Sequence, residues 1–343
     1  MSAGRYRVGI SSSDGDGVID CDATDTLLRG ALRNGVALSY ECNSGGCGSC
    51  KFDLLEGEVE NLWPEAPGLS PRDRRKGRLL ACQCRPISDC RIKARVEASA
   101  PPIRPSRREV AFVGRKALTP GMAEFRFVSE GAADFLPGQF AMLSLPGIDG
   151  ERAYSMSNTA NEDGQWRFII KRMPGGKGTG FLFDRLGTGD RIGLDGPYGN
   201  AWLREDNERD IVLIAGGSGL SPVVSIVRAI TSSERFSGRK VYFFYGGRGP
   251  QDICTERILK TLEPSGVELI CHTAVSDAAL AREAGWEGPR CFVHELVEQT
   301  LGDRMPEFEF YFCGPPPMTE AVQRMAMIDY KVPFDQLHFD RFF

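Results

Sequence analysis

Four cysteines constrain the fold of this chain more than any other residues do. Cys42, Cys47 and Cys50 stand in the stretch YECNSGGCGSC with the spacing C-x4-C-x2-C, and Cys82 follows 32 residues after Cys50. This is the plant-type spacing for a [2Fe–2S] cluster held by four thiolates. Glycines between the ligands let the backbone wrap closely and bring N–H groups toward the cluster sulfurs. The spacing therefore predicts a one-electron carrier near the N-terminus.

Two other arrangements of these thiols are open. A zinc site would use the pairs Cys47/Cys50 and Cys82/Cys84, but a glycine-packed C-x4-C-x2-C is not a zinc-knuckle spacing, and Cys42 would stay unused. Cys84 is also a rival fourth ligand of a cluster, because period-2 alternation would put it on the same face as Cys82. In the favoured arrangement Cys84 is a small packed residue, as are Cys21 and Cys90.

Composition excludes several classes of protein. A length of 343 residues suggests two or three domains. A net charge of −4 gives no signal for nucleic acid or an anionic membrane, and no apolar run reaches the ~18 residues of a membrane span. The start, MSAGRYRVGI, lacks the apolar core of a secretory signal. We therefore expect a cytoplasmic protein, whose eleven cysteines are ligands or free thiols rather than disulfides.

Two breaks in the sequence pattern indicate three domains. Residues 98–108, ASAPPIRPSRR, are rich in Pro, Ser and Arg, which favours an extended linker after a cysteine-rich domain of residues 1–97. A polar stretch near 200–208 divides the remainder into residues 109–205 and 206–343. In the first domain RYRVGI and GVIDC predict a hairpin, and TLLRGALRNG predicts a helix that stops at Gly35.

The second domain carries a motif typical of flavin binding. EVAFVGRKAL, MAEFRFV and WRFIIKR are short strands of the kind found in a small β-barrel. RAYSMSN, residues 152–158, resembles the R-x-Y-S-x-x-N flavin fingerprint of the ferredoxin–NAD(P)+ reductase family. Arg152 suits the dinucleotide pyrophosphate, Ala153 lies in the same motif, Tyr154 offers a ring face to the isoalloxazine, and Ser155 offers a catalytic hydroxyl near flavin N5.

A second element of the same domain favours FAD over FMN. The stretch IIKRMPGGKGTG contains Ile170, Lys171, Gly178 and Thr179, and its glycines free backbone N–H groups for the pyrophosphate. Thr179 replaces the Ser usual in the family and keeps the hydroxyl. DGPYG, residues 195–199, resembles the segment that closes the family's barrel. Two elements for one pyrophosphate resemble the FAD-binding members.

The third domain predicts an open parallel sheet that binds a nicotinamide dinucleotide. DIVLIA is a continuous apolar run of the kind found in buried parallel strands. It leads into Gly216, Gly217 and Gly219, with Ser221 as the expected N-cap and Pro222 as the first helical residue. Such a helix N-terminus faces a phosphate. Further strands in VYFFYGGR, VELICHTA and FEFYFCGPPPM place ligands at the carboxyl edge.

Several residues at that edge are candidates for the nicotinamide site. In the family the cysteine of CGPP, here Cys313 followed by Gly314, lies beside the nicotinamide, although Cys313 could also be a core residue. Arg248 resembles the arginine of the turn beneath the adenosine. Asp252 could accept from a ribose 2′-OH and favour NADH, or be a plain solvated residue. The three histidines are expected to be structural.

The chain ends in LHFDRFF. Family members have a terminal aromatic residue over the flavin, which moves when nicotinamide stacks. Phe342 or Phe343 is expected in this role, and Phe343 is the one that we predict to be catalytic. The alternative is that both pack against the last strand.

The complete pattern resembles the NADH reductase components of bacterial multicomponent oxygenases of the toluene type. The likeness covers essentially the whole chain and includes YECNSGGCG, LLEGEV, NLWP, ACQC and HFDRFF. It implies a plant-type β-grasp ferredoxin domain, an antiparallel flavin barrel and a parallel-sheet NAD domain. The plant-type ferredoxin likeness also implies that Cys82, after the apolar pair Leu79–Leu80, is the fourth ligand.

The same resemblance implies a function. Electrons would pass from NADH to FAD, then to [2Fe–2S], then to a Rieske-type ferredoxin of an aromatic-hydrocarbon monooxygenase system, or directly to an oxygenase component. The protein would be a monomer without nucleic-acid or membrane partners. A redox-sensing flavoprotein would need an output element, and none is visible in the sequence. A free-standing flavin or ferric reductase would not need the cluster.

Overall fold

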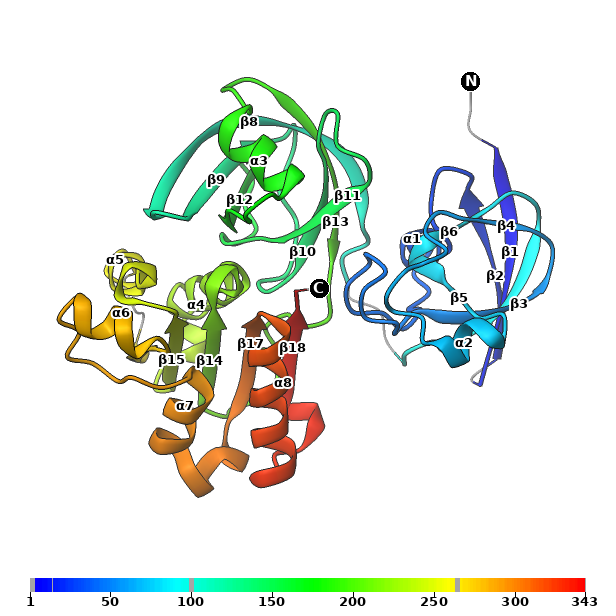
Figure 1. The fold of residues 1–343 in the computed structure, drawn as a ribbon. Helices are drawn as coiled ribbons and strands as arrows, with labels where there is room; N and C mark the ends of the chain where they lie inside the picture. The colour runs from blue at the N-terminus through cyan, green and yellow to red at the C-terminus, as the bar shows by residue number, and fades with distance from the viewer. Residues whose placement is uncertain (1–3, 14, 99–101, 263–265, 343) are drawn as a thin grey trace. The chain divides into compact units, whose positions relative to one another are not determined.

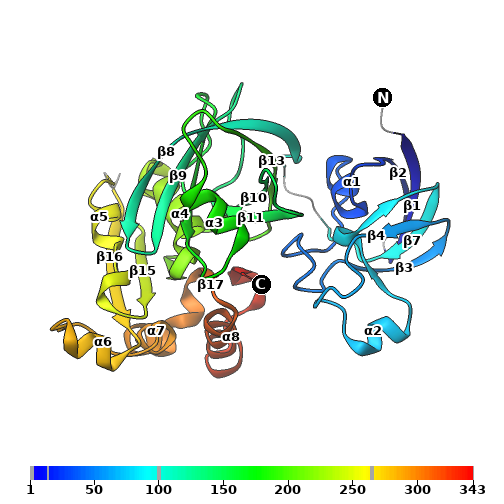
Figure 2. The same cartoon turned by 45° about the horizontal axis from the view of Figure 1, so that its top comes forward.

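The computed structural model describes residues 4–13, 15–98, 102–262 and 266–342. By its contacts the chain divides into two compact units. Among the described residues, unit 1 holds those within 4–107 and 195–199, and unit 2 holds those within 108–194 and 200–342. Figures 1 and 2 show the elements of each unit.

Unit 1 is built on a five-stranded sheet in the order β2-β1-β7-β3-β5. Its elements are β1 (Arg5–Ser12), β2 (Gly15–Asp22), α1 (Leu27–Arg33), β3 (Lys51–Glu56), β4 (Val59–Asn61), α2 (Pro71–Arg75), β5 (Leu79–Leu80), β6 (Cys84–Pro86) and β7 (Cys90–Ala94). The hairpin β1–β2 is antiparallel as predicted, β7 runs parallel to β1, and β3 runs antiparallel to β7. This mixed sheet with one packed helix is the expected β-grasp architecture.

Helix α1 packs closely on β2. Thr26 caps its start by accepting from the N–H of Arg29, and Gly35, with φ +81°, follows its end as predicted. A Cβ on Gly30 would lie 2.3 Å from the sulfur of Cys21, so only glycine allows this approach. Cys21 is therefore a packed residue, as the sequence predicted.

Buried charges tie residues 195–199 into unit 1. Asp195 accepts from Arg33 Nη2 at 2.7 Å and from Arg29 Nη1 at 3.2 Å. Asp25 accepts from Arg33 Nε at 2.9 Å and from Arg107 Nη2 at 2.6 Å. Buried carboxylates need such partners, because an unpaired buried charge is costly. These contacts explain why residues 195–199 group with unit 1, although residues 195–198 belong to barrel strand β13 (Arg191–Tyr198).

The strands from β8 to β13, most of whose residues lie in unit 2, form an antiparallel barrel with the strand order β11-β10-β13-β8-β9-β12. Its elements are β8 (Ser106–Thr119), β9 (Met122–Val128), β10 (Phe140–Ser144), β11 (Glu151–Ser155), β12 (Gln165–Lys171), α3 (Lys177–Asp184) and β13 (Arg191–Tyr198). A bridge between Met156 and Phe168 closes the barrel, and the N–H of Ser157 donates to Arg167 O at 2.7 Å. β8 begins at Ser106, inside the stretch that the sequence predicted as linker.

The second half of unit 2 is a parallel sheet with the order β16-β15-β14-β17-β18. Its elements are β14 (Ile211–Gly216), α4 (Leu220–Thr231), β15 (Lys240–Gly247), α5 (Thr255–Leu259), β16 (Glu268–Val275), α6 (Ala278–Glu283), α7 (Val293–Leu301), β17 (Glu309–Gly314), α8 (Pro316–Arg324) and β18 (Leu337–Arg341). Every residue of β14 is buried, as its continuous apolar run predicted.

One hydrophobic cluster joins the two halves of unit 2. Leu118, Met122 and Ile169 of the barrel belong to the same cluster as the apolar face of α4 and the facing side of β14. Helix α4 lies between barrel strand β12 and the parallel sheet in both views (Figures 1 and 2). This shared core explains why the flavin and nicotinamide regions form one compact unit.

Candidate cofactor sites

The loop after α1 brings two predicted cluster ligands together. Cys42 Sγ lies 3.2 Å from Cys47 Sγ. The N–H groups of Ser44 and Cys47 point at Cys42 Sγ at 3.5 and 3.3 Å, and the N–H of Ser49 points at Cys47 Sγ at 3.4 Å. The hydrogen bond from Cys47, together with these N–H groups, lowers the pKa of Cys42 to about 6 despite burial. A thiolate is the form that binds iron.

The other two predicted ligands form a second pair. Cys82 is buried and hydrogen-bonded to Cys50, and this bond and burial raise the pKa of Cys82. Gln83 Nε2 points at Cys82 Sγ from 3.7 Å. The rival Cys84 is also buried, and burial is the main cause that raises its pKa to about 12.

The arrangement in pairs fits a two-iron cluster. A tetrahedral zinc site needs four such ligands around one ion, whereas a [2Fe–2S] cluster shares its four thiolates between two irons. The pairs Cys42/Cys47 and Cys50/Cys82 supply that donor set.

In unit 2 the Arg152 side chain lies next to the start of α3, and its Nη1 donates to the backbone oxygens of Asp149 and Glu151 at 3.2 and 3.0 Å. A Cβ on Gly178, in the first turn of α3, would lie 3.3 Å from Arg152 Cγ. No side chain caps α3, so its first N–H groups are available to an anion. Thr179 Oγ1 accepts from the N–H of Met173 at 3.1 Å and holds the loop before the helix. A pyrophosphate fits this arrangement of donors.

The other predicted flavin-binding residues lie on two strands: Ala153, Tyr154 and Ser155 on β11, and Ile170 on β12. Tyr154 packs on the barrel core, where burial raises its pKa to about 12 against the opposing charge of Arg152. Ser155 is buried and Ala153 is exposed. The side chain of Ile170 is inside the barrel core, so only its backbone can face a cofactor.

Helix α4 is hydrogen-bonded to the end of the flavin motif. Ser221 Oγ donates to Ser155 O at 2.6 Å and accepts from the N–H of Ile169 at 2.9 Å. One turn later Ser225 Oγ donates to Asn158 O at 2.7 Å. The flavin motif and the dinucleotide helix are thereby fixed to each other.

The hydrogen bonds that Ser221, Ser225 and Arg228 of α4 make to the barrel are here called the seam, and Arg228 supplies its charged part. Arg228 Nη1 donates to Ser157 O at 2.6 Å and to Glu124 Oε1 at 3.1 Å. Ser157 Oγ also donates to Glu124 Oε1, at 3.1 Å. Ser221, Ser225 and Arg228 are spaced four and three residues apart, which places them on one face of α4.

The start of α4 differs from the sequence prediction. A 3-10 turn covers Gly217–Gly219 and α4 begins at Leu220, with Gly219 at the cap position. The prediction that Ser221 caps the helix with Pro222 as its first residue was wrong. The hydroxyl of Ser221 is used across the seam instead, a role that its position in the sequence does not reveal.

Close backbone approaches explain the glycines at the carboxyl edge of the parallel sheet. A Cβ on Gly219 would lie 2.0 Å from Cys313 O, and one on Gly216 would lie 2.5 Å from Met318 Sδ. Gly217 lies near Lys171, whose Cδ would be 3.8 Å from a Cβ there. Gly314 ends β17 and its carbonyl accepts from the N–H of Phe342 at 3.3 Å. The structure therefore brings the predicted residues of this edge together.

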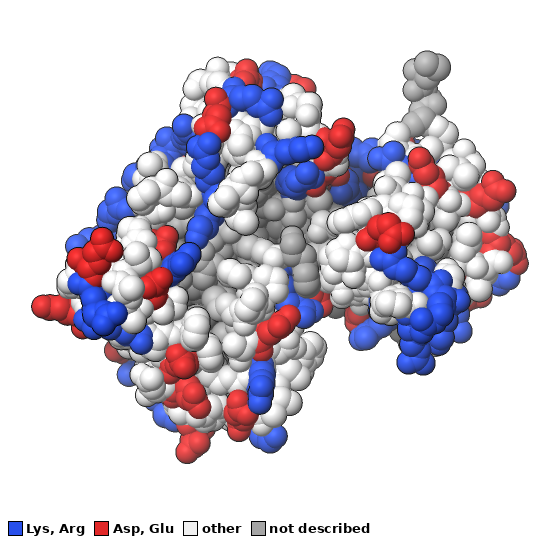
Figure 3. Space-filling view, in the orientation of Figure 1, with Lys and Arg blue, Asp and Glu red and all other residues white. Residues whose placement is uncertain are grey.

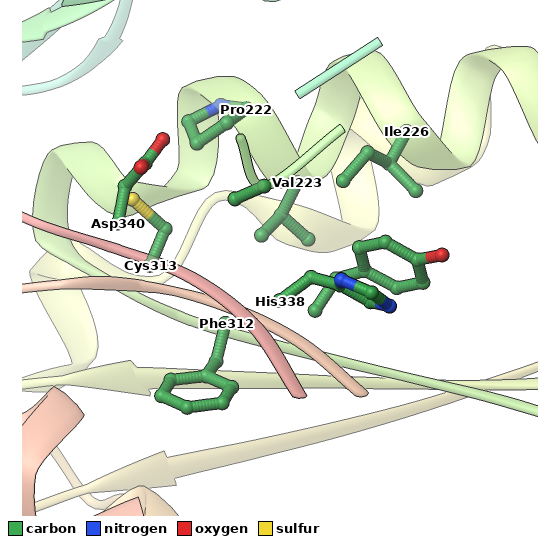
Figure 4. Close-up of a pocket in the computed structure, with 9 residues that line it drawn as sticks. Pro222, Val223, Ile226, Phe312, Cys313, His338 and Asp340 are labelled. Atoms are coloured by element: carbon green, nitrogen blue, oxygen red, sulfur yellow. The ribbon is translucent and has the colours of Figure 1, made fainter. Parts of the chain in front are cut away.

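Cys313 lines a small pocket at this edge. Its sulfur lies beside the carboxylate of Asp340, and Pro222 and Val223 of α4 face it (Figure 4). Phe312 points to the opposite side of its strand. Burial raises the pKa of Cys313, and Asp340 adds to this effect, so its thiol is not a nucleophile at neutral pH. Phe342 packs partly on the nearby core, and Phe343 lies outside the described residues.

Two carboxylates accompany Arg248 after β15. Asp252 Oδ2 accepts from the N–H groups of Arg248 and Gly249 at 3.2 and 3.0 Å, so one of its oxygens holds the turn. Asp277 caps α6, and its Oδ2 lies 3.6 Å from Arg248 Nε. The N–H of Leu280 is the main cause that lowers the pKa of Asp277. Sequence reasoning missed Asp277, although it lies two residues after the end of β16, at the carboxyl edge.

Comparison with protein families matches three consecutive domains. They are described as "2Fe-2S iron-sulfur cluster binding domain" over residues 12–86, "Oxidoreductase FAD-binding domain" over 110–202 and "Oxidoreductase NAD-binding domain" over 213–324. The chain thus carries FAD-, NAD- and [2Fe–2S]-binding domains, as the sequence predicted.

Relatives and solved structures match along the whole chain. The ferredoxin–NAD(P)(+) reductase CarAd of Metapseudomonas resinovorans is 43% identical, over 94% of this chain and 96% of the relative. The ferredoxin–NAD(+) reductase component of the alkene monooxygenase system of Xanthobacter autotrophicus is 39% identical, over 94% and 97%. A structure of the ferredoxin reductase in carbazole 1,9a-dioxygenase has a TM-score of 0.87 at 41% identity, over 99% of both chains. Among the described residues no helix is long and apolar enough to span a membrane.

Proposed function

We propose that this chain, which belongs to the family of flavin- and iron–sulfur-dependent NAD(P)H reductase components of bacterial oxygenase systems, passes electrons from NADH to a Rieske-type ferredoxin. The observation that carries the proposal is near-full-length similarity, at 43% and 39% identity, to two proteins named as ferredoxin reductases. When bound, the flavin supplies the exchange between two-electron hydride chemistry and one-electron transfer to the cluster.

The residues of unit 2 support the proposed flavin roles. Arg152 and the first turn of α3 hold the pyrophosphate, because a side chain with N–H donors lies next to a helix N-terminus. Tyr154 and Ser155 would contact the isoalloxazine ring of the flavin. Ser221 of α4 hydrogen-bonds to Ser155, so the residues that would hold the flavin and those that would hold the nicotinamide are directly connected.

The carboxyl edge of the sheet takes the dinucleotide in this proposal. Gly216, Gly217 and Gly219 leave room for its phosphates, and Cys313 and Gly314 lie at the nicotinamide. Phe342 packs near Gly314, and either it or Phe343 covers the flavin ring. In unit 1 Cys42, Cys47, Cys50 and Cys82 hold the cluster.

We propose that Asp277 favours NADH over NADPH. Arg248 is the cation that would bind a 2′-phosphate at this edge, and Asp277 lies 3.6 Å from it with a lowered pKa, so the carboxylate is charged at neutral pH. That negative charge repels a phosphate. Asp277→Asn should raise kcat/KM for NADPH about tenfold and change kcat/KM for NADH little. If the ratio of kcat/KM for NADPH to kcat/KM for NADH stays unchanged in this variant, Asp277 does not select the coenzyme.

A second acceptor class is supported by other relatives. Proteins named as reductase components of phenol 2-monooxygenase and propane 2-monooxygenase are 32% and 30% identical to this chain, and their names mention no ferredoxin. The alternative is therefore direct transfer to a terminal oxygenase. Stopped-flow mixing of the NADH-reduced protein with a Rieske ferredoxin, and separately with a hydroxylase, distinguishes them. Faster oxidation by the hydroxylase than by the ferredoxin would overturn the proposed acceptor.

We also propose an aromatic hydrocarbon as the final substrate of the system. A relative named as the electron transfer component of xylene/toluene monooxygenase, from Pseudomonas putida, is 31% identical over 93% of this chain. The protein would act in the cytoplasm as a monomer. Sedimentation of the cofactor-loaded protein tests the monomer, and toluene-dependent NADH consumption in a reconstituted system tests the substrate class.

A further inference from the structure

A segment of unit 1 lies directly on the cluster loop. Residues 61–78, here called the cluster cover, run NLWPEAPGLSPRDRRKGR. The N–H of Gly68 donates to Gly45 O at 2.9 Å, and a Cβ on Gly48 would lie 2.3 Å from Gly68 O. The N–H of Leu62 donates to Gln83 O, next to Cys82, at 2.8 Å. The cover therefore touches both stretches of chain that carry the ligands.

Two large apolar side chains of the cover face solvent. Trp63 is 43% exposed and Leu62 is 40% exposed. The inner side of the Trp63 ring lies on the cluster loop, because a Cβ on Gly45 would be 3.1 Å from Trp63 Cε3. Burying such a pair would stabilise a complex, and tryptophan is enriched among the residues that dominate binding energy. The exposed pair is thus placed beside the proposed point of electron exit.

The cover also carries a concentrated positive charge. It holds five Lys or Arg residues and two acidic residues, in a chain whose net charge is −4. Both acids are already engaged: Glu65 accepts from Arg74 at 2.9 Å, and the buried Asp73 accepts from Arg78 at 3.1 Å and from Lys51 of β3 at 2.9 Å. These internal pairs fix the shape of the segment.

The other three cations of the cover are exposed. Arg72, Arg75 and Lys76 have no ion pair within the parts of the chain that the structure describes. In Figure 3 the Lys and Arg side chains over α2 form a continuous blue area on unit 1. Cations without an ion pair, on the same segment as an exposed tryptophan, offer both long-range attraction and a desolvated centre to a partner.

We propose that the cluster cover is the docking surface for an acidic electron-accepting ferredoxin, with Arg72, Arg75 and Lys76 steering it and Trp63 forming the apolar centre of contact. The identity of the acceptor rests on the proposed function. Charge complementarity selects a negatively charged partner, while the negative net charge of the rest of the chain repels it elsewhere. The partner is thereby oriented with its acceptor group toward the cluster loop.

The test reverses these charges in the cofactor-loaded protein. The triple variant Arg72→Glu, Arg75→Glu and Lys76→Glu is compared with a control that reverses Arg5, Arg126 and Arg324, which are exposed and lie on β1, β9 and α8. Both triples change the net charge equally. The probe is an acidic Rieske ferredoxin, reduced at several salt concentrations. NADH–ferricyanide activity checks the flavin, and the visible spectrum checks the cluster.

Roughly tenfold slower second-order reduction of the ferredoxin at low salt is expected for the cover variant but not for the control. The difference should vanish near ~1 M salt, where the Debye length is about 3 Å. Cytochrome c, a basic protein, should be reduced no more slowly, since the reversed charges attract it. Trp63→Ala should slow ferredoxin reduction at all salt concentrations, with an unchanged cluster spectrum.

Three outcomes would overturn the proposal. Equal salt dependence in the cover variant and the control would refute the docking surface and leave the ferredoxin function standing. Failure of the wild-type protein to reduce any Rieske ferredoxin would refute the acceptor and the surface assigned to it together. A low-salt dimer of the reductase that only the cover variant loses would assign the patch to a second copy of this chain.

Discussion

The hydroxyl of Ser221 makes a specific test of the seam between the flavin motif and α4. It is buried, donates to Ser155 O at 2.6 Å and accepts from the N–H of Ile169 at 2.9 Å. Ser221→Ala removes both bonds and leaves a buried N–H without its partner. An orphaned buried donor costs about 1–3 kcal/mol and a lost hydrogen bond about 1 kcal/mol. The free energy of unfolding of unit 2 should therefore fall by roughly 2–4 kcal/mol.

Urea unfolding of the full chain, followed by release of flavin fluorescence, measures this loss. With an m-value of about 2–3 kcal/mol/M, the midpoint should fall by roughly 1 M. NADH–ferricyanide turnover should fall as well, because Ser155 is no longer held by α4. The full-length protein is used because the barrel and the sheet share one core.

Two further variants, one within α4 and one at its C-cap, calibrate the result. Ser225→Ala removes one buried bond, from Ser225 Oγ to Asn158 O, and should cost about 1–2 kcal/mol. Ser232→Ala removes only an exposed bond to Ala229 O and should stay within about 0.5 kcal/mol of wild type. If Ser221→Ala unfolds at the same urea concentration as Ser232→Ala, the seam does not stabilise unit 2 and the reasoning fails.

The remaining predictions concern the sheet edge and the buried phenols. Gly219→Ala places a Cβ 2.0 Å from the backbone oxygen of Cys313, so the free energy of unfolding of unit 2 should fall by about 1–3 kcal/mol and NADH turnover should fall too. The control is Gly121→Ala, whose added Cβ meets nothing within 4 Å. Equal unfolding midpoints of the two variants would contradict the close approach. Burial raises the pKa of Tyr154 to about 12 and also raises those of Tyr198, Tyr245 and Tyr311. Since the unfolded chain ionises these phenols near pH ~10, the stability they contribute is present below that pH and is lost as pH rises toward 12. A pH series of urea midpoints that stays flat between about 9 and 11 would count against this burial.

The elements of the fold followed from local patterns in the sequence. The continuous apolar run of residues 211–215 predicted a buried parallel strand, and β14 is buried throughout. The hairpin of unit 1 and the helix ending before Gly35 were predicted from alternation and a glycine stop. Such signals lie within short windows of sequence, so a single chain reveals them.

Contacts between distant segments were harder to predict. Asp195 pairs with arginines about 160 residues earlier in the chain, and Ser221 bonds to Ser155 rather than capping its own helix. A serine before a proline carries the same local signal in both roles. The spacing of Ser221, Ser225 and Arg228 on one face of α4 was the available signal for the seam, but only the folded chain shows what that face meets.

The candidate site was predictable where chemistry needs a fixed pattern. Cys42 and Cys47 meet as the spacing implied, and Gly178 lies against Arg152, the second residue proposed for the pyrophosphate. One oxygen of Asp252 holds a turn and the Ile170 side chain fills the core, so Ile170 can meet a cofactor only through its backbone. Asp277 was missed because an N-cap aspartate looks the same in the sequence whether or not it faces a ligand.

The proposed function requires that electrons reach a ferredoxin only through the cluster, with Cys82 proposed as one of its four ligands, whereas a small acceptor such as ferricyanide can take them from the flavin. The most direct measurement compares NADH-driven reduction of a Rieske ferredoxin and of ferricyanide by Cys82→Ser, with Cys84→Ser as the buried control on β6. The account predicts that Cys82→Ser loses the cluster spectrum and ferredoxin reduction but keeps ferricyanide reduction, while Cys84→Ser keeps all three. Ferredoxin reduction at the wild-type rate by Cys82→Ser would contradict it.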